Sequence, residues 1–303
     1  MSLERILIPL DGSETAEAIL PQVNRLLRQG SAEILLLQSV PYPPDFHIAL
    51  PTVLEDARRY IRRVTFQLVN GGIRARGLVE QGLAAATVLD VAQKEGVSLI
   101  AMTTHGRSGL SRWAFGSVAE KVLRASPVPV LAVRSFRPGP GGGLSRGRLE
   151  EIPFRNILVP VDGREASLSV LPTVLDLARP IDAHVTLLCV HEPTDLEGRW
   201  DSPDALAAEA REILVKACIP VTTELRRGDP GLEILKAADD LSTDLIAMST
   251  HGRSGPSRWV LGSVTEKVLR GSTVPMLVAR RRKELERAEE SARGAGSDVL
   301  GPV

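Results

Sequence analysis

The sequence predicts two α/β domains in tandem, each a parallel β-sheet with helices on both of its faces. Length is the first reason, because 303 residues suggest about two domains of ~150 residues each. Repetition is the second, because Ile100–Arg124 returns as Ile246–Arg270 with 20 of 25 positions identical. The third reason is that short apolar runs alternate with helical patterns, as in a parallel sheet covered by helices.

The first half opens with a strand at Ile6–Leu10, a continuous apolar run of the kind that is buried on both faces. Ser13 is a suitable N-cap for the next helix, which we expect to end near Gly30. Four more strands are expected at Ile34–Val40, Arg74–Glu80, Leu99–Thr103 and Val130–Val133. The helices between them are expected at Val53–Asn70, Ala84–Glu95 and Gly116–Arg124.

The second half repeats this order of elements. Equivalent residues are 151 positions apart at Asp11 and Asp162, but 146 apart at His105 and His251. Five residues are therefore missing from the second half, and we expect them to correspond to part of Pro41–Pro51. A period this long indicates duplicated globular domains rather than a solenoid of short repeats. The strands of the second half are expected near Ile157–Val161, Val185–Val190, Val221–Leu225, Leu245–Ser249 and Met276–Ala279.

Composition places the domain boundaries. We assign a first domain to residues 1–136 and a second domain to residues 152–282. Residues 137–151 between them are rich in proline and glycine, which is typical of a linker. Residues 283–303 form a charged tail that we expect to be partly disordered.

Charge and cysteine content narrow the class of protein. A formal net charge of zero argues against a dedicated nucleic-acid binder. The two cysteines, Cys189 and Cys218, match neither a disulfide framework nor a zinc motif. No apolar run approaches the ~18 residues of a membrane helix, and the N-terminus does not resemble a signal peptide. We therefore expect a cytoplasmic protein that does not bind membranes.

Polar residues follow the first and fourth strands of each half. In an open parallel sheet, ligands bind at the carboxyl ends of the strands, where the strand order reverses. Asp11 follows the first strand, and Thr103-Thr104-His105-Gly106 ends the fourth. Gly116-Ser117 then opens a helix, whose N–H groups and positive end favour an anion such as phosphate. An acceptor at one end and a phosphate cradle at the other fit the polarity of a nucleotide.

A purely structural interpretation stands beside this one. Gly116 and Ser117 would then simply start a helix, and His105 would pack against a turn. Trp113 and Trp259 would anchor the loop on the domain rather than stack on a base. The faithful duplication of the whole loop favours a functional site.

Known motifs help mainly by exclusion. The sequence contains neither the phosphate loop GxxxxGK[ST] nor GxGxxG after the first strand. It also lacks the nucleophile motif GxSxG, because Leu110 stands where the last glycine belongs. Paired carboxylates, metal-ligand clusters and a nucleophile with an evident base are not found, so no catalytic residue is assigned.

Three segments together resemble the universal stress protein family: PLDGS near the N-terminus, THGRSGLSRWAFGSVAEKVLR, and PVPVLAVR. Both halves match, so the resemblance covers nearly everything except the linker and the tail. It implies a five-stranded parallel sheet in the order 3-2-1-4-5 in each half. It also implies that the first and fourth strands are neighbours.

ATP-binding members of that family carry G-x2-G-x9-G-[ST]. Here the pattern reads Thr103-x2-Gly106-x9-Gly116-Ser117 in the first half and Ser249-x2-Gly252-x9-Gly262-Ser263 in the second. The first glycine is therefore replaced twice, which puts a Cβ and a hydroxyl near the ribose or phosphates. Ser249 is the smaller of the two replacements, so the second site should be the less crowded.

The resemblance implies a nucleotide site in each half. The carboxylates would accept from adenine or ribose, the ends of the second strands would lie along adenine, and the loops would follow ribose and phosphates. Mg²⁺ would be held mainly by the phosphates rather than by the protein. The implied site residues of the first half are Pro9, Asp11, Ser39, Val40, Thr103, Thr104, His105, Gly106, Arg107, Ser108, Gly109, Gly116, Ser117 and Val118. Those of the second half are Pro160, Asp162, Val190, Ser249, Thr250, His251, Gly252, Arg253, Ser254, Gly255, Gly262, Ser263 and Val264.

The resemblance favours an ATP-binding stress-response regulator with little or no turnover. One alternative is a slow ATP hydrolase, for which only His105 and His251 are candidate bases. Another is an interaction module that binds no nucleotide. The glycines retained from the family motif argue against it. We also expect the halves to pair internally through their fifth strands, within Pro127–Val133 and Val274–Ala279, leaving helical faces free for a homodimer.

Overall fold

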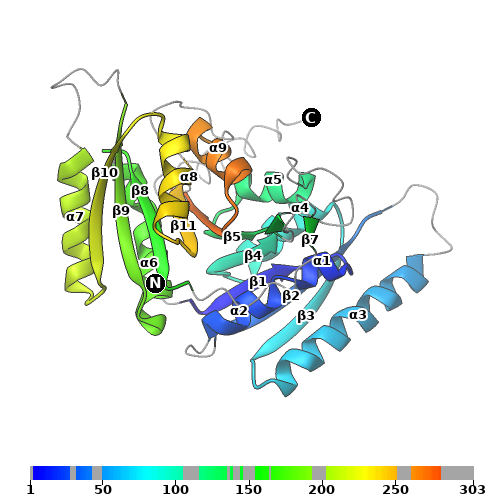
Figure 1. Ribbon diagram of the computed structural model, residues 1–303. Coiled ribbons are helices and arrows are strands. Elements are labelled where there is room, and N and C mark those ends of the chain that lie inside the picture. The colour runs from blue at the N-terminus through cyan, green and yellow to red at the C-terminus, as the bar shows by residue number, and fades with distance from the viewer. Residues whose placement is uncertain are drawn as a thin grey trace, which may run out of the picture.

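Each half of the chain forms a parallel sheet flanked by helices in the computed structural model (Figure 1). The structure describes residues 3–27, 32–42, 50–104, 116–134, 137–138, 144–145, 154–163, 165–192, 203–250 and 261–280. Among these residues, every helix is too short or too polar to cross a lipid bilayer.

The strand order 3-2-1-4-5 occurs in both halves, as the resemblance to the universal stress protein family implies. In the first half the sheet runs β3-β2-β1-β4-β5, with all four pairs parallel. These strands are β1 Arg5–Pro9, β2 Glu33–Val40, β3 Ala75–Gln81, β4 Leu99–Thr103 and β5 Val130–Val133. In the second half the order is β10-β9-β8-β11-β12, again parallel. Its strands are β8 Asn156–Val161, β9 His184–His191, β10 Val221–Arg227, β11 Leu245–Ser249 and β12 Met276–Ala279.

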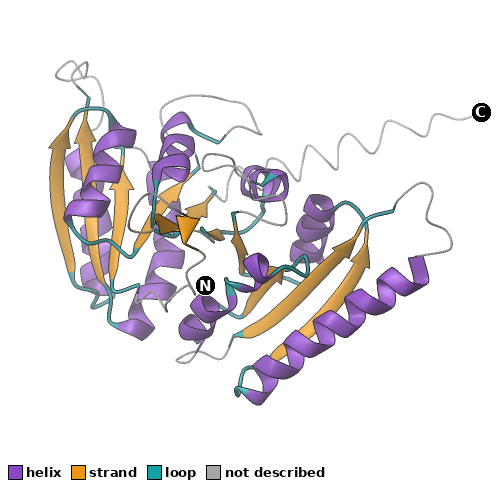
Figure 2. Ribbon diagram, turned by 45° about the vertical axis from the view of Figure 1, so that its right-hand side comes forward, coloured by secondary structure: helices purple, strands orange, loops and turns teal. Residues whose placement is uncertain are grey.

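Helices cover both faces of each sheet, which Figure 2 shows in purple against the orange strands. In the first half α1 Glu14–Glu17, α2 Leu20–Leu27 and α3 Leu50–Asn70 pack on one face, and α4 Ala84–Lys94 and α5 Ser117–Ala125 on the other. In the second half the first face holds α6 Leu171–Ala178 and α7 Pro203–Lys216, and the other holds α8 Pro230–Asp240 and α9 Ser263–Gly271.

Side-chain alternation along β1 builds these two layers of core. Ile6 and Ile8 are buried with the helices of the first face, and Leu7 with those of the second. Both faces are covered, so the strand is a continuous apolar run and shows no polar alternation.

The first helix of each half is interrupted, which the sequence analysis did not predict. A single helix ending near Gly30 was expected, but α1 ends at Glu17 and α2 starts at Leu20. Pro21 explains the break, because it has no N–H to bond to the carbonyl of residue 17. Pro172 holds the equivalent position, where the 3₁₀ helix η1 Glu165–Val170 precedes α6.

The five-residue difference between the halves lies between the second and third strands. Equivalent residues are still 151 apart at Glu33 and His184, where β2 and β9 begin, and are 146 apart at Ala75 and Val221, where β3 and β10 begin. Most of Pro41–Pro51, where the sequence analysis expects the missing residues, lies outside the described residues, so the exact position of the difference stays a prediction.

Two short segments of the expected linker pair with each other. Strands β6 Arg137–Pro138 and β7 Leu144–Ser145 form a small antiparallel ladder, with Arg137 opposite Ser145. The linker is therefore not wholly irregular.

The two five-stranded sheets join through their fifth strands in the structure. Strand β12 pairs antiparallel with β5, so ten strands form one sheet with β3 and β10 at its edges. The paired residues are Met276 with Ala132, Leu277 with Leu131, and Val278 with Val130.

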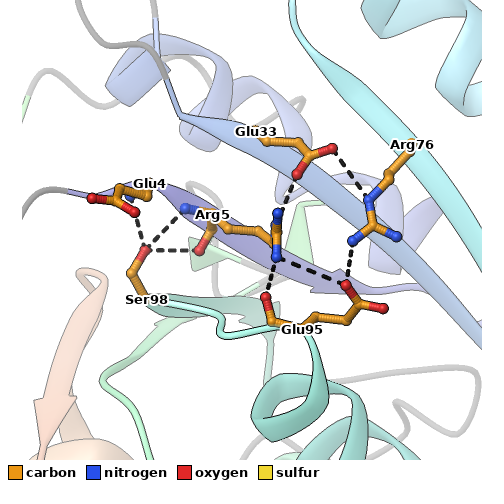
Figure 3. A network of polar contacts seen from close by, with 6 residues as sticks. All are labelled: Glu4, Arg5, Glu33, Arg76, Glu95 and Ser98. Carbon is orange, nitrogen blue, oxygen red and sulfur yellow. Dashed lines mark hydrogen bonds and ion pairs between the residues drawn. The ribbon is translucent and has the colours of Figure 1, made fainter.

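A charged cluster joins the amino ends of β1, β2 and β3 in the first half (Figure 3). Arg5 Nε donates to Glu33 Oε2 at 2.7 Å, and Arg76 Nε donates to Glu33 Oε1 at 3.2 Å. Arg76 also pairs with the Glu95 carboxylate, and Arg5 donates to the Glu95 carbonyl. Ser98 Oγ accepts from the backbone amides of Glu4 and Arg5, both at 3.1 Å.

The second half has a pocket where the first half has this cluster. Asn156, His184, Thr222 and Leu241 stand at the positions of the four charged residues. The pocket they help to line has a volume of about 160 Å³. Asp244, at the position of Ser98, keeps the local role, because its Oδ2 accepts from the amides of Arg155 at 2.9 Å and Asn156 at 3.0 Å.

Candidate functional site

The site is built from the carboxyl ends of the first, second and fourth strands. After β1 the chain turns at Gly12, whose φ of 84° lies in the left-handed region that favours glycine. Gly163 has a φ of 79° after β8, so the same turn recurs. Each turn leaves an aspartate, Asp11 or Asp162, directly beyond the strand.

The carboxylate of Asp11 is fixed by Ser13. The Ser13 amide donates to Asp11 Oδ1 at 3.0 Å, and the Ser13 hydroxyl donates to the same oxygen at 2.5 Å. The hydroxyl oxygen also accepts from the Ala16 amide at 3.1 Å, so Ser13 is the N-cap that the sequence predicts. In the second half this position is Arg164, so Asp162 cannot receive the same hydroxyl bond.

The end of β4 ties three segments together. Thr104 is buried, and its amide donates to the Val133 carbonyl of β5 at 2.9 Å. Its carbonyl accepts from the Gly116 amide at 2.8 Å. The chain therefore leaves the carboxyl end of β4 and returns to the same place. The second half repeats both bonds with the same lengths, from Thr250 to the Ala279 carbonyl and from Gly262 to the Thr250 carbonyl.

The loop residues between these anchors lie outside the described residues, except for Leu261, which is buried. They include the expected site residues His105, Gly106, Arg107, Ser108 and Gly109, with His251, Gly252, Arg253, Ser254 and Gly255 in the second half.

The helix that follows each loop starts without a side-chain cap. Gly116 and Gly262 are the N-cap residues, and among the described residues no side chain caps either helix. The backbone at Gly116, with φ −59° and ψ 137°, is open to any residue, so conformation alone does not require glycine there. Ser117 and Ser263 are exposed in the first helical turn. Uncapped N–H groups and the positive end of each helix are the elements of an anion site.

The residues that replace the first motif glycine are both buried. Thr103 and Ser249 end β4 and β11 and are 8% exposed. The second half has one additional contact here, because Thr265 Oγ1 donates to the Ser249 carbonyl at 3.0 Å. Ala119 holds the equivalent position in the first half and cannot form this bond.

The end of β2 lies beside β1, where Leu10 donates from its amide to the Leu37 carbonyl at 2.8 Å. Ser39 Oγ donates to the Gly82 carbonyl at 2.8 Å, so this hydroxyl holds the turn before α4. Val190, its counterpart on β9, cannot form that bond. The remaining expected residues lie on the same strand ends and helix starts: Pro9 on β1, Val40 on β2, Pro160 on β8, Val118 on α5 and Val264 on α9.

Tyr60 of α3 is a neighbour of Asp11 that the sequence analysis missed. Burial raises the pKa of Tyr60 above its usual range, and the carboxylates of Glu17 and Asp11 act in the same direction. Arg63 lies over the Tyr60 ring at 5.2 Å and pairs with Glu17 at 2.8 Å. The second half has Leu206 at the position of Tyr60, so the two sites differ in polarity on this side.

Fold and site together define a doubly wound α/β protein. At the carboxyl ends of the strands, each half has an aspartate and a helix N-terminus that no described side chain caps. The sequence model of the universal stress protein family matches residues 2–134 and 153–280. The chain therefore belongs to the universal stress protein family, with two copies of the family domain in tandem.

Known proteins resemble one half or the whole chain. A universal stress protein of Methanocaldococcus jannaschii is 31% identical over 144 residues, which cover 43% of this chain and 85% of the relative. The universal stress protein YxiE of Bacillus subtilis is 27% identical over 145 residues, covering 43% of this chain and 98% of the relative. A solved universal stress protein from Archaeoglobus fulgidus covers 93% of this chain and 100% of its own, with a TM-score of 0.75 and 23% identity. That last likeness extends the fold assignment to both halves.

Proposed function

We propose that each half binds one adenine nucleotide, ATP, and that nucleotide occupancy controls the shape or the partners of a stress-response regulator. The observation that carries the proposal is the uncapped helix N-terminus bonded to the end of the fourth strand, from Gly116 to Thr104 and from Gly262 to Thr250. This arrangement supports the proposal because the backbone N–H groups lie at the carboxyl ends of the strands, where doubly wound folds bind ligands.

The two ends of the nucleotide would meet groups of opposite character. Asp11 and Asp162 would accept hydrogen bonds from ribose or adenine at the ends of β1 and β8. The amides and hydroxyls of Ser117 and Ser263 would donate to phosphate, and the intervening loops would follow ribose and phosphates. Mg²⁺ would be bound mainly by the phosphates. No cluster of three or more metal-ligating side chains occurs in the part of the chain that the structure describes.

The proposed activity is binding rather than catalysis. The candidate bases are His105 and His251 alone, and a slow ATP hydrolase remains the alternative that they would support. Retained glycines at positions 106, 116, 252 and 262 weigh against a module that binds no nucleotide.

We further propose that the domains, residues 1–136 and 152–282, act as an internal pair in the cytoplasm. Support comes from the ladder between β5 and β12 and from the ion pair of Arg124 with Glu266, whose N and O atoms lie 4.0 Å apart. Residues 137–151 would link the domains and residues 283–303 would form the tail, while the helical faces would be free to form a homodimer.

Native mass spectrometry of the purified chain, with and without added ATP, tests the proposal. Two bound nucleotides per chain are expected at saturation, and one if only one half is competent. A chain that remains free of nucleotide in ATP well above cellular levels would leave the interaction module as the better account.

A further inference from the structure

Arg134 of the first half contacts a helix of the second half. It directly follows β5, and its Nη2 donates to the carbonyl of Leu269 at 3.1 Å and to that of Arg270. Both carbonyls belong to the last turn of α9. The contact therefore crosses from one copy of the repeat to the other.

The chemistry of this contact is that of a helix C-cap supplied from outside the helix. The last four carbonyls of a helix have no partners within it, and they form the negative end of the helix dipole. A guanidinium can bond to the free carbonyls and also stabilise the negative end of the dipole, because it carries several N–H donors and a positive charge. Burial of Arg134 disfavours its charged form, as the lowered pKa of this group shows, so the two carbonyls compensate for lost hydration.

The helix that Arg134 holds is the one that starts at the candidate anion site of the second half. Helix α9 runs from Ser263 to Gly271, a length of roughly 13 Å at ~1.5 Å per residue. A helix this short moves as one body, so its C-terminal anchor also sets the position of its N-terminus. The N-terminal end is bonded within its own half, by Gly262 to Thr250.

We propose that Arg134 is a positioning residue for the nucleotide site of the second half, so that one half completes the site of the other. This inference rests on the proposed nucleotide binding. It adds that α9 presents its N–H groups to phosphate correctly only while Arg134 of the neighbouring half holds the opposite end.

Two backgrounds isolate the two sites. Gly116→Val is designed to block ATP binding at the first anion site, so that the measured affinity is that of the second site. Gly262→Val is designed to block the second site, so that the measured affinity is that of the first. Arg134→Ala, Arg134→Lys and a control, Arg62→Ala, are placed in each background. Arg62 is an exposed arginine of α3 that pairs with Glu55 and contacts no part of the second half in the described structure. ATP affinity is measured by calorimetry, and folding by near-UV circular dichroism.

Arg134→Ala is expected to weaken ATP binding about fivefold or more in the Gly116→Val background and to leave it unchanged in the Gly262→Val background. Arg134→Lys keeps the charge and should retain part of the affinity, and it serves as the test if the alanine variant does not fold. The bond from the Thr104 amide to the Val133 carbonyl involves only backbone atoms, so neither substitution removes its donor or its acceptor.

Equal losses in both backgrounds would mean general destabilisation and would overturn the inference. Unchanged affinity at the second site in folded Arg134 variants would overturn it as well. Absence of ATP binding in both backgrounds before Arg134 is changed would refute the proposed function itself.

Discussion

Leu131 and Leu277 are the same residue of the repeat, and they lie opposite each other where β5 meets β12. The flanking pairs are symmetric about them, because Ala132 faces Met276 and Val130 faces Val278. A pseudo-two-fold axis therefore passes between the two leucines and relates one half to the other. Any contact that one half makes across this axis has a counterpart position in the other, such as Arg280 for Arg134.

We expect Gly116→Val combined with Gly262→Val to abolish ATP binding while the fold stays intact. Valine tolerates the backbone angles at both positions, with φ of −59° and −56°, so strain is not the cause. Its branched side chain would instead occupy the place where phosphate meets the helix. Calorimetry measures the loss, and the matched control is Gly116→Ala with Gly262→Ala, for which a smaller loss is expected. Wild-type affinity in a folded double valine variant would contradict the anion site.

Replacing Thr103 by serine and Ser249 by threonine should reverse which of the two sites binds ATP more tightly. Both side chains are buried at the ends of β4 and β11, and threonine adds one methyl group beside the proposed ligand. We expect the second site to bind ATP more tightly in the wild type and Thr103→Ser to raise the affinity of the first site several-fold. The reciprocal variant, Ser249→Thr, should lower the affinity of the second. Titration in the Gly262→Val and Gly116→Val backgrounds separates the sites, and changes of the opposite sign would show that the threonine methyl group favours binding.

ATP hydrolysis should be very slow, well below the usual enzyme range of ~1–10³ s⁻¹. The reason is that no residue other than His105 and His251 offers itself as a base for an attacking water. A phosphate-release assay on the wild type and on His105→Ala with His251→Ala checks this. Turnover of several per second that disappears in the double variant would favour the hydrolase instead.

Cleavage of the linker should leave the two halves associated. A protease site inserted between Gly141 and Gly142 cuts the covalent connection but leaves the ladder between β5 and β12 intact. We expect the cut protein to elute in size-exclusion chromatography as one particle of the uncut size. Two particles of about half that mass would show that the linker alone holds the halves together.

Acid should remove a stabilising contribution that Glu33 makes to the first half. The hydrogen bond from Arg5, with the nearby Arg76, holds the pKa of Glu33 below its usual range. A carboxylate with a lowered pKa in the folded state stabilises that state above the ordinary glutamate pKa of about 4.3, and the contribution is lost as the pH falls through the folded value. The equivalent residue of the second half is His184, so this carboxylate has no counterpart there.

Urea unfolding of Glu33→Gln measures this effect. At pH 7 the variant should lose about 1 kcal/mol of unfolding free energy, a modest value because the cluster is partly exposed to solvent. The loss should shrink as the pH is lowered toward 3. Glu209→Gln, at an exposed position of α7, is the control and should change little at either pH. A loss that is independent of pH would assign the effect to packing.

The central strands were predictable because burial on both faces gives each of them a continuous apolar run in the sequence. Ile6–Leu10 and Leu99–Thr103 are apolar runs that match β1 and β4 within one residue. The break at Pro21 was readable in principle, since proline cannot continue α1 into α2, but a helix start and a helix interruption look alike when proline stands near an N-terminus.

Contacts between distant residues were the part that the sequence could not supply. The carboxylates of Glu17 and Asp11 act on Tyr60 only because α3 packs against β2 and β3, and nothing near Tyr60 in the sequence signals this. The charged cluster of Arg5, Glu33 and Arg76 joins residues from three strands. The contact of Arg134 with α9 depends on the register between β5 and β12, which patterns within one strand do not determine.

The bond from the Gly116 amide to the Thr104 carbonyl holds the residues on either side of the segment 105–115 together at the carboxyl end of β4. Gly262 and Thr250 fix residues 251–261 in the same way. A segment anchored like this can change its composition without shifting the strands that carry it. We therefore expect residues 105–114 and 251–260 to be exchangeable between the halves as units, whereas Leu261 would have to stay because it is buried in the core of the second half.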